Sequence, residues 1–260
     1  MPRPAARPTL TSVHNAARVL RAFSVQDREL GVSDLARRLG LAKSVVHRLL
    51  RTLVDERLLE QDVDTGRYRL GIKLYELGVA VSSHADLHAA VIPPIDELHH
   101  RTGDSVHVAI LDGAEVVYVE RREAQRTLQP LGEVGHRNFA HSTATGKVLL
   151  AHLRPAELDR AVGSTELPAL TPHTITDPAR LRQELAAVRE RGYAENREES
   201  RISLSSVAAP IRGETGAVIA AVSVVALSDR LSGESRRRYT AATLDTAAEI
   251  SDRLGYRPGR

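Results

Sequence analysis

Two stretches of helical periodicity that meet at a glycine constrain the fold of the first third of this chain. Apolar residues recur at helical spacing over 33–39 and again over 42–53. Gly40 lies between the two stretches, and glycine accepts the positive φ that commonly ends a helix. The other face of the second stretch is polar and basic. The sequence therefore predicts a helix-turn-helix whose second helix presents a polar face to solvent or to a partner.

The flanking segments complete the predicted N-terminal module. Apolar residues at helical spacing over 13–23, after the candidate N-cap Ser12, predict a preceding helix. Two extended runs flank a polar turn within 58–70, which predicts a β-hairpin in the position of a wing. The predicted domains are a disordered arm over 1–11, a winged helix-turn-helix over 12–71, a linker helix over 72–83 and a larger domain over 84–260.

The exposed face of the second helix has the chemistry of a DNA-reading surface. An α-helix is about 10–12 Å across and fits the major groove, which is about 12 Å wide. Arg48 is long enough for a bidentate contact with guanine, and Arg67 and Arg69 on the hairpin can hold phosphates. The alternative is a solvated face on an ordinary three-helix unit. The predicted DNA-binding residues are Lys43, Ser44, Val45, His47, Arg48, Arg51, Arg67 and Arg69.

The charge distribution favours a nucleic-acid partner for the first module. Residues 1–82 contain 14 Arg or Lys and 9 Asp or Glu, a net charge of +5, whereas the remaining residues contain 22 and 24, a net charge of −2. A basic module joined to a near-neutral one is typical of a phosphate-binding head on a sensing or catalytic body. The absence of cysteine excludes disulfides and thiolate zinc sites. With no signal-like start and no apolar run of about 18 residues, the chain is expected in the cytoplasm, away from membranes.

The larger second part mixes helices with hairpin-linked strands. Extended runs over 106–119 flank Asp112-Gly113, and two more over 204–211 and 217–227 flank glycines, so the sheet is predicted to be largely antiparallel. Pro93-Pro94 is expected to break or restart the helix that opens this part. The fold class is therefore α+β. Further helices are expected through 144–153, 178–191 and 244–254.

Thr145-Gly146-Lys147 suggests a phosphate-binding loop, but the surrounding residues do not fit one. That motif needs glycine where His141 stands and Ser or Thr where Val148 stands. The start of the helix can still hold an anion, because its N–H groups and its dipole favour negative charge. His84 and His88 share a helix face without a third metal ligand. We therefore predict no catalytic residue, no metal site and no cofactor.

Several sequence blocks resemble one family of regulators. The first module resembles the winged N-terminal domain of IclR-family transcriptional regulators in the runs LARRLGLAKSVVHRLLRTL and GRYRLGIKLYELG. The second part resembles the effector-binding domain of that family in HVAILDGAEVVYVERRE, AHSTATGKVLLAHL, TPHTITDPARLRQELAAVRERGYAENREES and SVAAPI. The resemblance covers about residues 12–254 and implies a winged helix-turn-helix, a linker helix and a GAF/PAS-like effector domain. It also implies homodimers or homotetramers that bind pseudo-palindromic operators in double-stranded DNA, as repressors or activators.

The resemblance implies an effector pocket that departs from the common family pattern. Asn196 stands where an acidic residue is usual, and Ser206 stands where cysteine is usual. Asn138-Phe139 replaces a Leu-Pro pair, and Val225 replaces the second serine of a Ser-x-Ser pattern. The implied effector-binding residues are Asn138, Ala144, Thr145, Asn196, Leu204, Ser206 and Ser223.

These departures suggest a small-molecule effector, for example a carboxylate, that is larger or more apolar than a very small oxo-acid. Leu204 and Phe139 are expected to supply apolar walls. The alternative is that Ser206 and Ser223 are strand residues bonded to the backbone and that Asn196 is a solvent-exposed loop residue. Sequence alone leaves both interpretations open.

The sequence as a whole predicts a ligand-responsive transcriptional regulator without enzymatic activity. A bound metabolite would act through the helix over 72–83 on the separation of two recognition helices, and so on their fit to two half-sites. Two alternatives come from other classes: a metabolite-converting enzyme with a basic N-terminal domain, and an architectural DNA-binding protein without a ligand. An apolar stripe is available for dimerisation at Val13, Leu20, Leu74 and Leu77.

Overall fold

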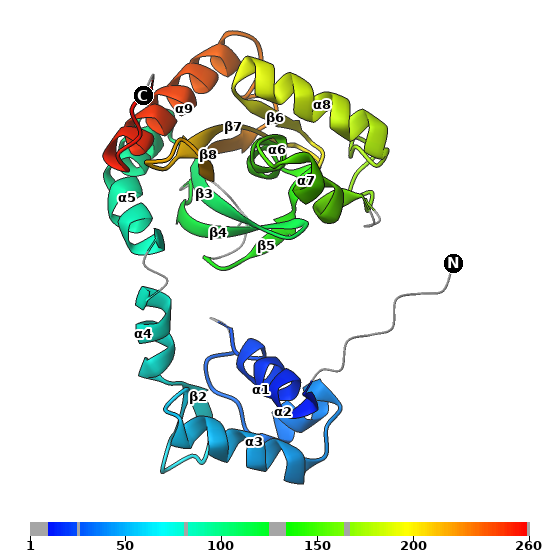
Figure 1. Cartoon of the computed structure of the whole chain (residues 1–260), viewed down its shortest axis with the longest axis vertical. Helices are drawn as coiled ribbons and strands as arrows, with labels where there is room; N and C mark the ends of the chain where they lie inside the picture. The colour runs from blue at the N-terminus through cyan, green and yellow to red at the C-terminus, as the bar shows by residue number, and fades with distance from the viewer. Residues whose placement is uncertain (1–9, 25–26, 81–82, 125–133, 164–166, 259–260) are drawn as a thin grey trace. The chain divides into compact units, whose positions relative to one another are not determined.

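The chain forms two compact units, Met1–His84 and Ala85–Arg260, and each is described by itself (Figure 1). The predicted arm over 1–11 lies outside the described residues except for Leu10 and Thr11, and Thr11 already begins the first helix. The computed structural model describes residues 10–24, 27–80, 83–124, 134–163 and 167–258.

Helices and a β-hairpin surround an apolar core in the first unit. Its elements are α1 (Thr11–Arg21), α2 (Val32–Leu39), α3 (Lys43–Asp55), β1 (Leu59–Gln61), β2 (Tyr68–Leu70) and α4 (Ile72–Ala80). Val19, Leu35 and Leu50 come from α1, α2 and α3, and all three are fully buried in this core. Gly40 joins α2 to α3 with a φ of 64°, a left-handed conformation that glycine adopts without a Cβ clash. The predicted helix-turn-helix is confirmed.

The hairpin of β1 and β2 forms the predicted wing. The two strands are antiparallel, with Leu59 opposite Leu70. Leu59 and Tyr68 are buried in the core of the unit, and Tyr68 also pairs with Leu30 in an isolated bridge. Burial of one face therefore fixes the hairpin to the helices. The linker helix follows as α4, although residues 81 and 82, near its expected end, lie outside the described residues.

A six-stranded sheet with helices on both faces forms the second unit. Its strands are β3 (Ser105–Asp112), β4 (Glu115–Arg122), β5 (Arg137–Phe139), β6 (Ala194–Arg197), β7 (Leu204–Arg212) and β8 (Val218–Leu227). Its helices are α5 (Ser83–Thr102), the 3₁₀ helix η1 (Ala140–Ser142), α6 (Ala144–Ala151), α7 (Pro155–Val162), α8 (Pro178–Arg191) and α9 (Gly233–Arg253). The strand order is β5-β4-β3-β8-β7-β6, and every described pair is antiparallel, which confirms the α+β prediction. None of the helices in the described ranges has the combination of length and apolar character that crossing a membrane requires.

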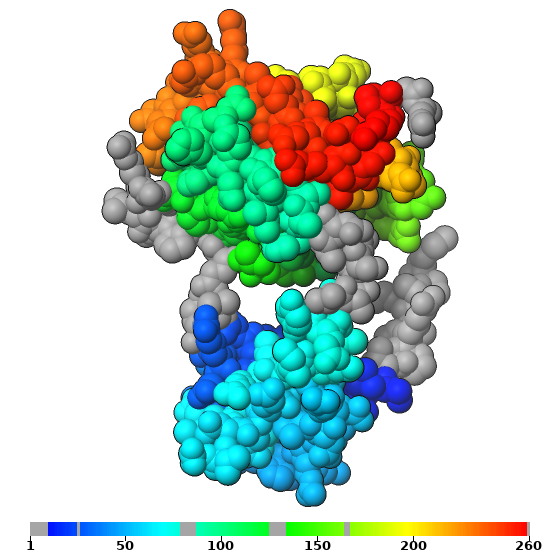
Figure 2. All heavy atoms as spheres, turned by 90° about the vertical axis from the view of Figure 1, so that its left-hand side faces the viewer, coloured from blue at the N-terminus to red at the C-terminus, as the bar shows by residue number. Residues whose placement is uncertain are grey.

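Alternation along the strands divides the core of this unit into two layers. Val106 and Val108 of β3 lie on one face, where they pack in a cluster with Ile95 of α5 and Ile250 of α9. Ala109 lies on the other face, in the cluster that contains α6 and α8. Figures 1 and 2 show α5 and α9 side by side over the first face. The second face is therefore the one that α6 and α8 cover.

Helix α5 continues through Pro93 and Pro94, so the expected break is wrong. Each proline lacks an N–H group and cannot donate to the carbonyl four residues earlier. Val91, Ile95 and Leu98, on both sides of the prolines, are nevertheless fully buried in the layer between α5 and the sheet. Tertiary packing of this apolar stripe thus holds the helix across the missing hydrogen bonds.

Helix α6 is buried on all sides, and its first turn depends on a glycine. All eight residues from Ala144 to Ala151 are buried. Thr143 caps the helix, since its Oγ1 accepts a hydrogen bond from the N–H of Gly146 at 3.1 Å. A Cβ added at Gly146 would lie 2.2 Å from the carbonyl oxygen of Ala140. Glycine is therefore what allows η1 and the start of α6 to pack this closely.

Gly146→Ala is expected to lower the free energy of unfolding by about 1–3 kcal/mol, because the atoms that the new Cβ meets belong to the backbone. Calorimetric unfolding of the full chain measures this loss. Gly78→Ala is the matched control, since a Cβ at Gly78 in α4 has no atom within 4 Å, and alanine favours a helix interior. Equal transition temperatures for Gly146→Ala and the native chain would contradict the argument.

Candidate functional site

The exposed face of α3 carries most of the predicted base-reading residues. Val46, Leu50 and Leu53 are buried in the core of the first unit, which turns the polar face of the helix outward. The exposed residues on that face are Lys43, Ser44, His47, Arg48 and Arg51. Val45 is half-buried. Within the described residues, none of these exposed side chains forms an ion pair, so their charge remains available to a phosphate or a base.

The predicted wing arginines are exposed but already have acidic neighbours. Arg69 lies 2.9 Å from the carboxylate of Glu60 on the paired strand. Arg67 lies 3.6 Å from the carboxylate of Asp34 and donates to the backbone carbonyl of Glu29 at 3.2 Å. These contacts orient both side chains and offset part of their charge. The cations of α3 are therefore less neutralised than those of the wing.

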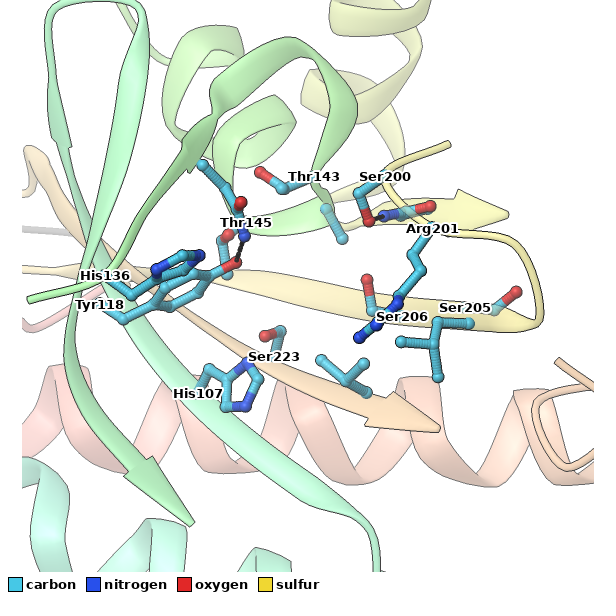
Figure 3. A pocket seen from close by; sticks show the side chains of 15 residues that line it. His107, Tyr118, His136, Thr143, Thr145, Ser200, Arg201, Ser205, Ser206 and Ser223 are labelled. Atoms are coloured by element: carbon cyan, nitrogen blue, oxygen red, sulfur yellow. Dashed lines mark hydrogen bonds between the residues drawn. The ribbon is translucent and has the colours of Figure 1, made fainter. Parts of the chain in front are cut away.

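A cavity of about 290 Å³ lies in the second unit, on the α6 side of the sheet (Figure 3). The start of α6, the strands β3 to β8 and the loop after β6 all contribute to its lining. Ser206 and Ser223 line it from the neighbouring strands β7 and β8, and Thr145 lines it from the helix. Their neighbours Val207, on β7, and Val224, on β8, lie in the opposite core layer, as strand alternation requires.

The start of α6 presents hydrogen-bond donors to this cavity. The N–H groups of Ala144 and Thr145 lie in the first turn, where no carbonyl of the same helix can accept from them. The cap Thr143 bonds Gly146 instead. The Thr145 hydroxyl is buried, and among the described residues it has no hydrogen-bond partner. The positive end of the helix and an unsatisfied hydroxyl therefore face the same space.

The loop after β6 is fastened to α6 by polar contacts. The amide nitrogen of Asn196 donates to the carbonyl of Ser142 at 3.0 Å and to Oγ of Ser200 at 2.9 Å. Its amide oxygen accepts from the N–H of Glu199 at 2.8 Å. The Glu199 carboxylate in turn forms a buried ion pair with Lys147 at 2.6 Å. Asn196 thus shapes the pocket wall through its contacts within the protein.

A neutral imidazole lies at the opposite wall. His107 of β3 is 2% exposed, and this burial lowers its pKa more than its hydrogen bond with Glu123 raises it. Arg121 lies 3.0 Å from Nε2 of His107 and 5.2 Å from the centre of the Tyr118 ring. The Tyr118 hydroxyl accepts from the amide nitrogen of Asn138 at 3.4 Å. His107 is therefore uncharged at neutral pH and offers the cavity a polar ring.

The charge of the pocket favours an anion. Arg201, which Figure 3 shows extending toward Ser206, lines the cavity with its guanidinium group. The imidazole of His107, which also lines the cavity, is neutral and adds no charge. Among the described residues of the lining, none carries a carboxylate. Together with the helix start, this arrangement can hold a negatively charged group without a repelling partner.

Comparison with known families assigns both units. The IclR helix-turn-helix domain matches residues 12–63, and the C-terminal domain of bacterial IclR transcriptional regulators matches residues 79–252. The chain belongs to the IclR family. The resemblance in the sequence blocks is thus confirmed. IclR-family regulators combine a DNA-binding domain with an effector-binding domain, as the two units here do.

Relatives of this IclR-family chain are transcriptional regulators. The regulator XynR of Escherichia coli is 35% identical over 249 residues, which cover 96% of this chain and 99% of the relative. The glycerol operon regulatory protein of Streptomyces coelicolor is 36% identical over 253 residues, which cover 95% and 97%. Both relatives are regulatory proteins.

Solved IclR structures have the same fold. An IclR homologue from Microbacterium hydrocarbonoxydans, complexed with 4-hydroxybenzoate, superposes with a TM-score of 0.83 at 30% identity, covering 94% of this chain and 99% of that one. The IclR of Thermotoga maritima superposes with a TM-score of 0.74 at 29% identity, covering 95% and 100%. The first of these structures shows that an IclR homologue binds a small aromatic carboxylate.

The structure brings the predicted effector residues together around one cavity. Those that line it are Asn138, Ala144, Thr145, Asn196, Leu204, Ser206 and Ser223. The interpretation of Asn196 as an exposed loop residue is wrong, since it is 4% exposed on β6. The backbone-bonding alternative for Ser206 and Ser223 fails too, because neither hydroxyl has a hydrogen-bond partner among the described residues. Their role in effector binding stays a prediction.

Phe139 was expected to form an apolar wall, and this expectation is wrong. Asn138 lines the cavity, whereas Phe139 follows it on β5 and therefore points to the other side. The Phe139 ring instead lies 5.8 Å from that of His141. The lining residues that the predicted set does not contain are His107, Tyr118, His136, Thr143, Ser200, Arg201, Ser205 and Val225. Alternation along β3 indicates His107, but only the tertiary fold brings Tyr118 and Arg201 to the cavity.

Proposed function

We propose that this IclR-family protein is a cytoplasmic transcriptional regulator whose binding to operator DNA changes when a small carboxylate occupies the pocket of the second unit. The observation that carries the proposal is the buried Thr145 hydroxyl without a partner, beside the open first turn of α6. Buried polar groups are normally satisfied. A bound carboxylate would accept hydrogen bonds from the hydroxyl and from the helix N–H groups, as anions do at helix starts.

We infer that the protein acts by binding and not by catalysis. Its relatives are regulators. The pocket hydroxyls of Ser206 and Ser223 have no hydrogen-bonded base among the described residues that could activate them as nucleophiles. The enzyme alternative therefore lacks the arrangement that covalent catalysis needs. No observation favours an architectural DNA-binding protein without a ligand. The pocket contains donors that lack a partner in the protein, namely the Thr145 hydroxyl and the N–H groups in the first turn of α6.

For DNA binding, we propose that α3 enters the major groove and that the wing holds the backbone. Arg48 lies on the exposed face of α3, toward the middle of the helix, and it has no ion-pair partner among the described residues. A long planar guanidinium in that position suits the two acceptors of guanine. Arg67 and Arg69 lie on the hairpin and would contact phosphates. Arg69 would then give up part of its ion pair with Glu60 in exchange for a phosphate contact.

The protein is proposed to bind its operator as a homodimer or a homotetramer. One recognition helix covers too few base pairs for specificity in a genome, and two half-sites require two copies. Apolar side chains are available on the first unit for such contacts: Val13 on α1 is 63% exposed, and Tyr75 and Leu77 on α4 are 70% and 50% exposed. Leu20 and Leu74 of the expected stripe are half-buried.

Arg48→Ala is expected to weaken binding to the preferred operator by about 1–3 kcal/mol and to change binding to random duplex little, because a base contact carries sequence information. The operator is selected from random duplexes with the native protein, and both affinities are measured by gel shift. Arg180→Ala, an exposed arginine on α8, is the control for the loss of one positive charge. If Arg48→Ala has the same ratio of specific to random affinity as the native protein, Arg48 of α3 does not contact a base as proposed.

Sedimentation equilibrium at micromolar concentration is expected to give a mass of at least twice the 28.4 kDa of one chain. Leu77→Glu should shift the protein toward monomer, because the change puts a charge on the exposed apolar side of α4. Val63→Glu on the wing tip, where Val63 is 96% exposed, is the matched control. A native monomer, both with and without operator, would refute the dimer.

Thr145→Val is expected to keep operator binding and to lose most of the response to the effector. Valine keeps the branched shape but removes the hydroxyl that would donate to the carboxylate. The readout is a gel shift against a titration of carboxylates. Thr240→Val, on α9 outside the pocket, is the matched control, because its hydroxyl bonds its own helix. A full response from Thr145→Val would place the sensing site elsewhere.

A further inference from the structure

We propose that Arg121 is a positioning residue of the effector pocket, because its guanidinium fixes the imidazole of His107 in the tautomer that carries the proton on Nδ1. His107 then presents an N–H donor, and not a lone pair, to the occupant of the cavity. Arg121 is not one of the described residues that line the cavity, so it acts through His107. This inference rests on the proposed function and goes beyond it by assigning the state of one wall of the pocket.

The imidazole of His107 is held in the wall of the cavity. His107 lies on β3 opposite Ser223 of β8, and both residues line the cavity (Figure 3). The residue is 2% exposed. The ring of Tyr118 packs edge-on against the imidazole, with the ring centres 5.1 Å apart and the planes at 67°. What this fixed ring offers to an occupant depends on which of its two nitrogens carries the proton.

The contact at Nε2 decides where the proton lies. A guanidinium nitrogen of Arg121 is 3.0 Å from Nε2 of His107. Arginine has only donors at physiological pH, so Nε2 must accept this hydrogen bond and cannot carry a proton itself. In a neutral imidazole the one proton then lies on Nδ1, because the hydrogen bond at one ring nitrogen sets the state of the other.

Glu123 offers the same nitrogen the opposite arrangement, but its carboxylate has closer partners. Its Oε1 is 3.5 Å from Nε2 of His107, and a hydrogen bond there would need the proton on Nε2. The same oxygen is 2.5 Å from the guanidinium of Arg121, and Oε2 accepts from the hydroxyl of Ser105 at 3.2 Å. Glu123 therefore holds Arg121 in the position from which it donates to His107.

The charge of Arg121 also disfavours a doubly protonated ring. Burial lowers the pKa of His107 more than Glu123 raises it, and the positive charge of Arg121 lowers it further. The side chain of Arg121 is 4% exposed, so water and salt screen this charge little. The neutral ring with a bare Nε2 is therefore the form that this arrangement stabilises.

Nδ1 is the nitrogen that remains for the occupant of the cavity. Among the described residues it has no hydrogen-bond partner. With the proton on Nδ1, His107 can bond an acceptor atom of the effector, whereas an atom that only donates would leave the N–H group unsatisfied at a cost. Arg121 thus determines which kind of atom this wall of the pocket selects, although it does not line the cavity itself.

Nuclear magnetic resonance of the full chain, labelled with ¹⁵N in its histidines, tests the assignment directly. The correlations between the ring nitrogens and the carbon-bound ring protons differ between the two neutral tautomers and the charged ring. Comparison with His107→Gln identifies the signals of His107. At neutral pH the native protein should show a neutral His107 with a protonated Nδ1. A protonated Nε2, in a neutral or a charged ring, would overturn the inference.

Substitution of Arg121 separates control of the tautomer from simple packing. Arg121→Met keeps apolar bulk beside the ring but removes the donor, so the proton of His107 should move to Nε2, where Glu123 can accept it. Arg121→Lys keeps a charged donor and should retain the native spectrum. Arg122→Met is the matched control, because Arg122 is the next residue on β4 and pairs with Asp96 of α5. Circular dichroism confirms that each variant is folded.

These spectra are recorded without any effector, so their outcome is separate from that of the operator titration that tests the proposed function. The response of the native protein to carboxylates can fail while the tautomer is as assigned, and the reverse can also occur. If folded Arg121→Met shows the same tautomer of His107 as the native protein, Arg121 only packs beside the ring and the inference fails.

Discussion

A buried ion pair between Lys147 and Glu199 joins helix α6 to the loop after β6, two elements that contribute to the lining of the cavity. The two charged groups are 2.6 Å apart, and their residues are 1% and 6% exposed. Removing two charges from water is costly, and only close geometry with further hydrogen bonds offsets that cost. Here the backbone around Glu199 is held as well, by Asn196 and by the hydroxyl of Thr174, which donates to its carbonyl at 2.6 Å. These contacts together fix the backbone conformation of the loop. They hold Glu198 at a φ of 61°, which is unfavourable for a residue with a Cβ. The loop that carries Ser200 and Arg201 to the cavity therefore depends on this pair.

The second constraint is the two-residue period of the strands. In β7 and β8 the face toward α5 and α9 carries Val207, Ile211, Val222 and Val224, whereas the face toward α6 carries mainly small residues, Ser206, Ala208, Ala221 and Ser223, together with Val225. Small residues on that face leave room, because α6 packs over part of it and a cavity remains beside the helix. The same period turns Phe139 away and brings Asn138 to the cavity. A sheet with large side chains on both faces would fill this space. The pocket is thus a consequence of residue size on one face of the sheet.

Much of the fold could be predicted from the sequence because its signals are local. Gly40 between two apolar stripes indicates the helix-turn-helix, and Asp112-Gly113 indicates the β3–β4 hairpin, as both elements confirm. The prediction at Pro93-Pro94 was wrong because a local signal was outweighed by tertiary packing. The missing N–H groups of the two prolines predict a break, but burial of the apolar side of α5 keeps the helix continuous. The candidate pocket residues came from resemblance and not from periodicity. Arg201 and Tyr118 could not be found in this way, because they are far apart in the chain and meet only when β4 and the loop after β6 join the same wall.

The strand β3, which lines the cavity, also packs against helix α5, which opens the second unit. His107 faces the cavity, while its neighbours Val106 and Val108 on the same strand pack against Leu98 and Val91 of α5. The chain continues from α5 back to α4 and the DNA-binding unit. If occupancy of the pocket changes operator affinity by some factor, operator binding must change effector affinity by the same factor, because the coupling free energy belongs to both equilibria. A ligand that bonds the Thr145 hydroxyl, which has no partner among the described residues, would stabilise the arrangement of the pocket in which that bond forms.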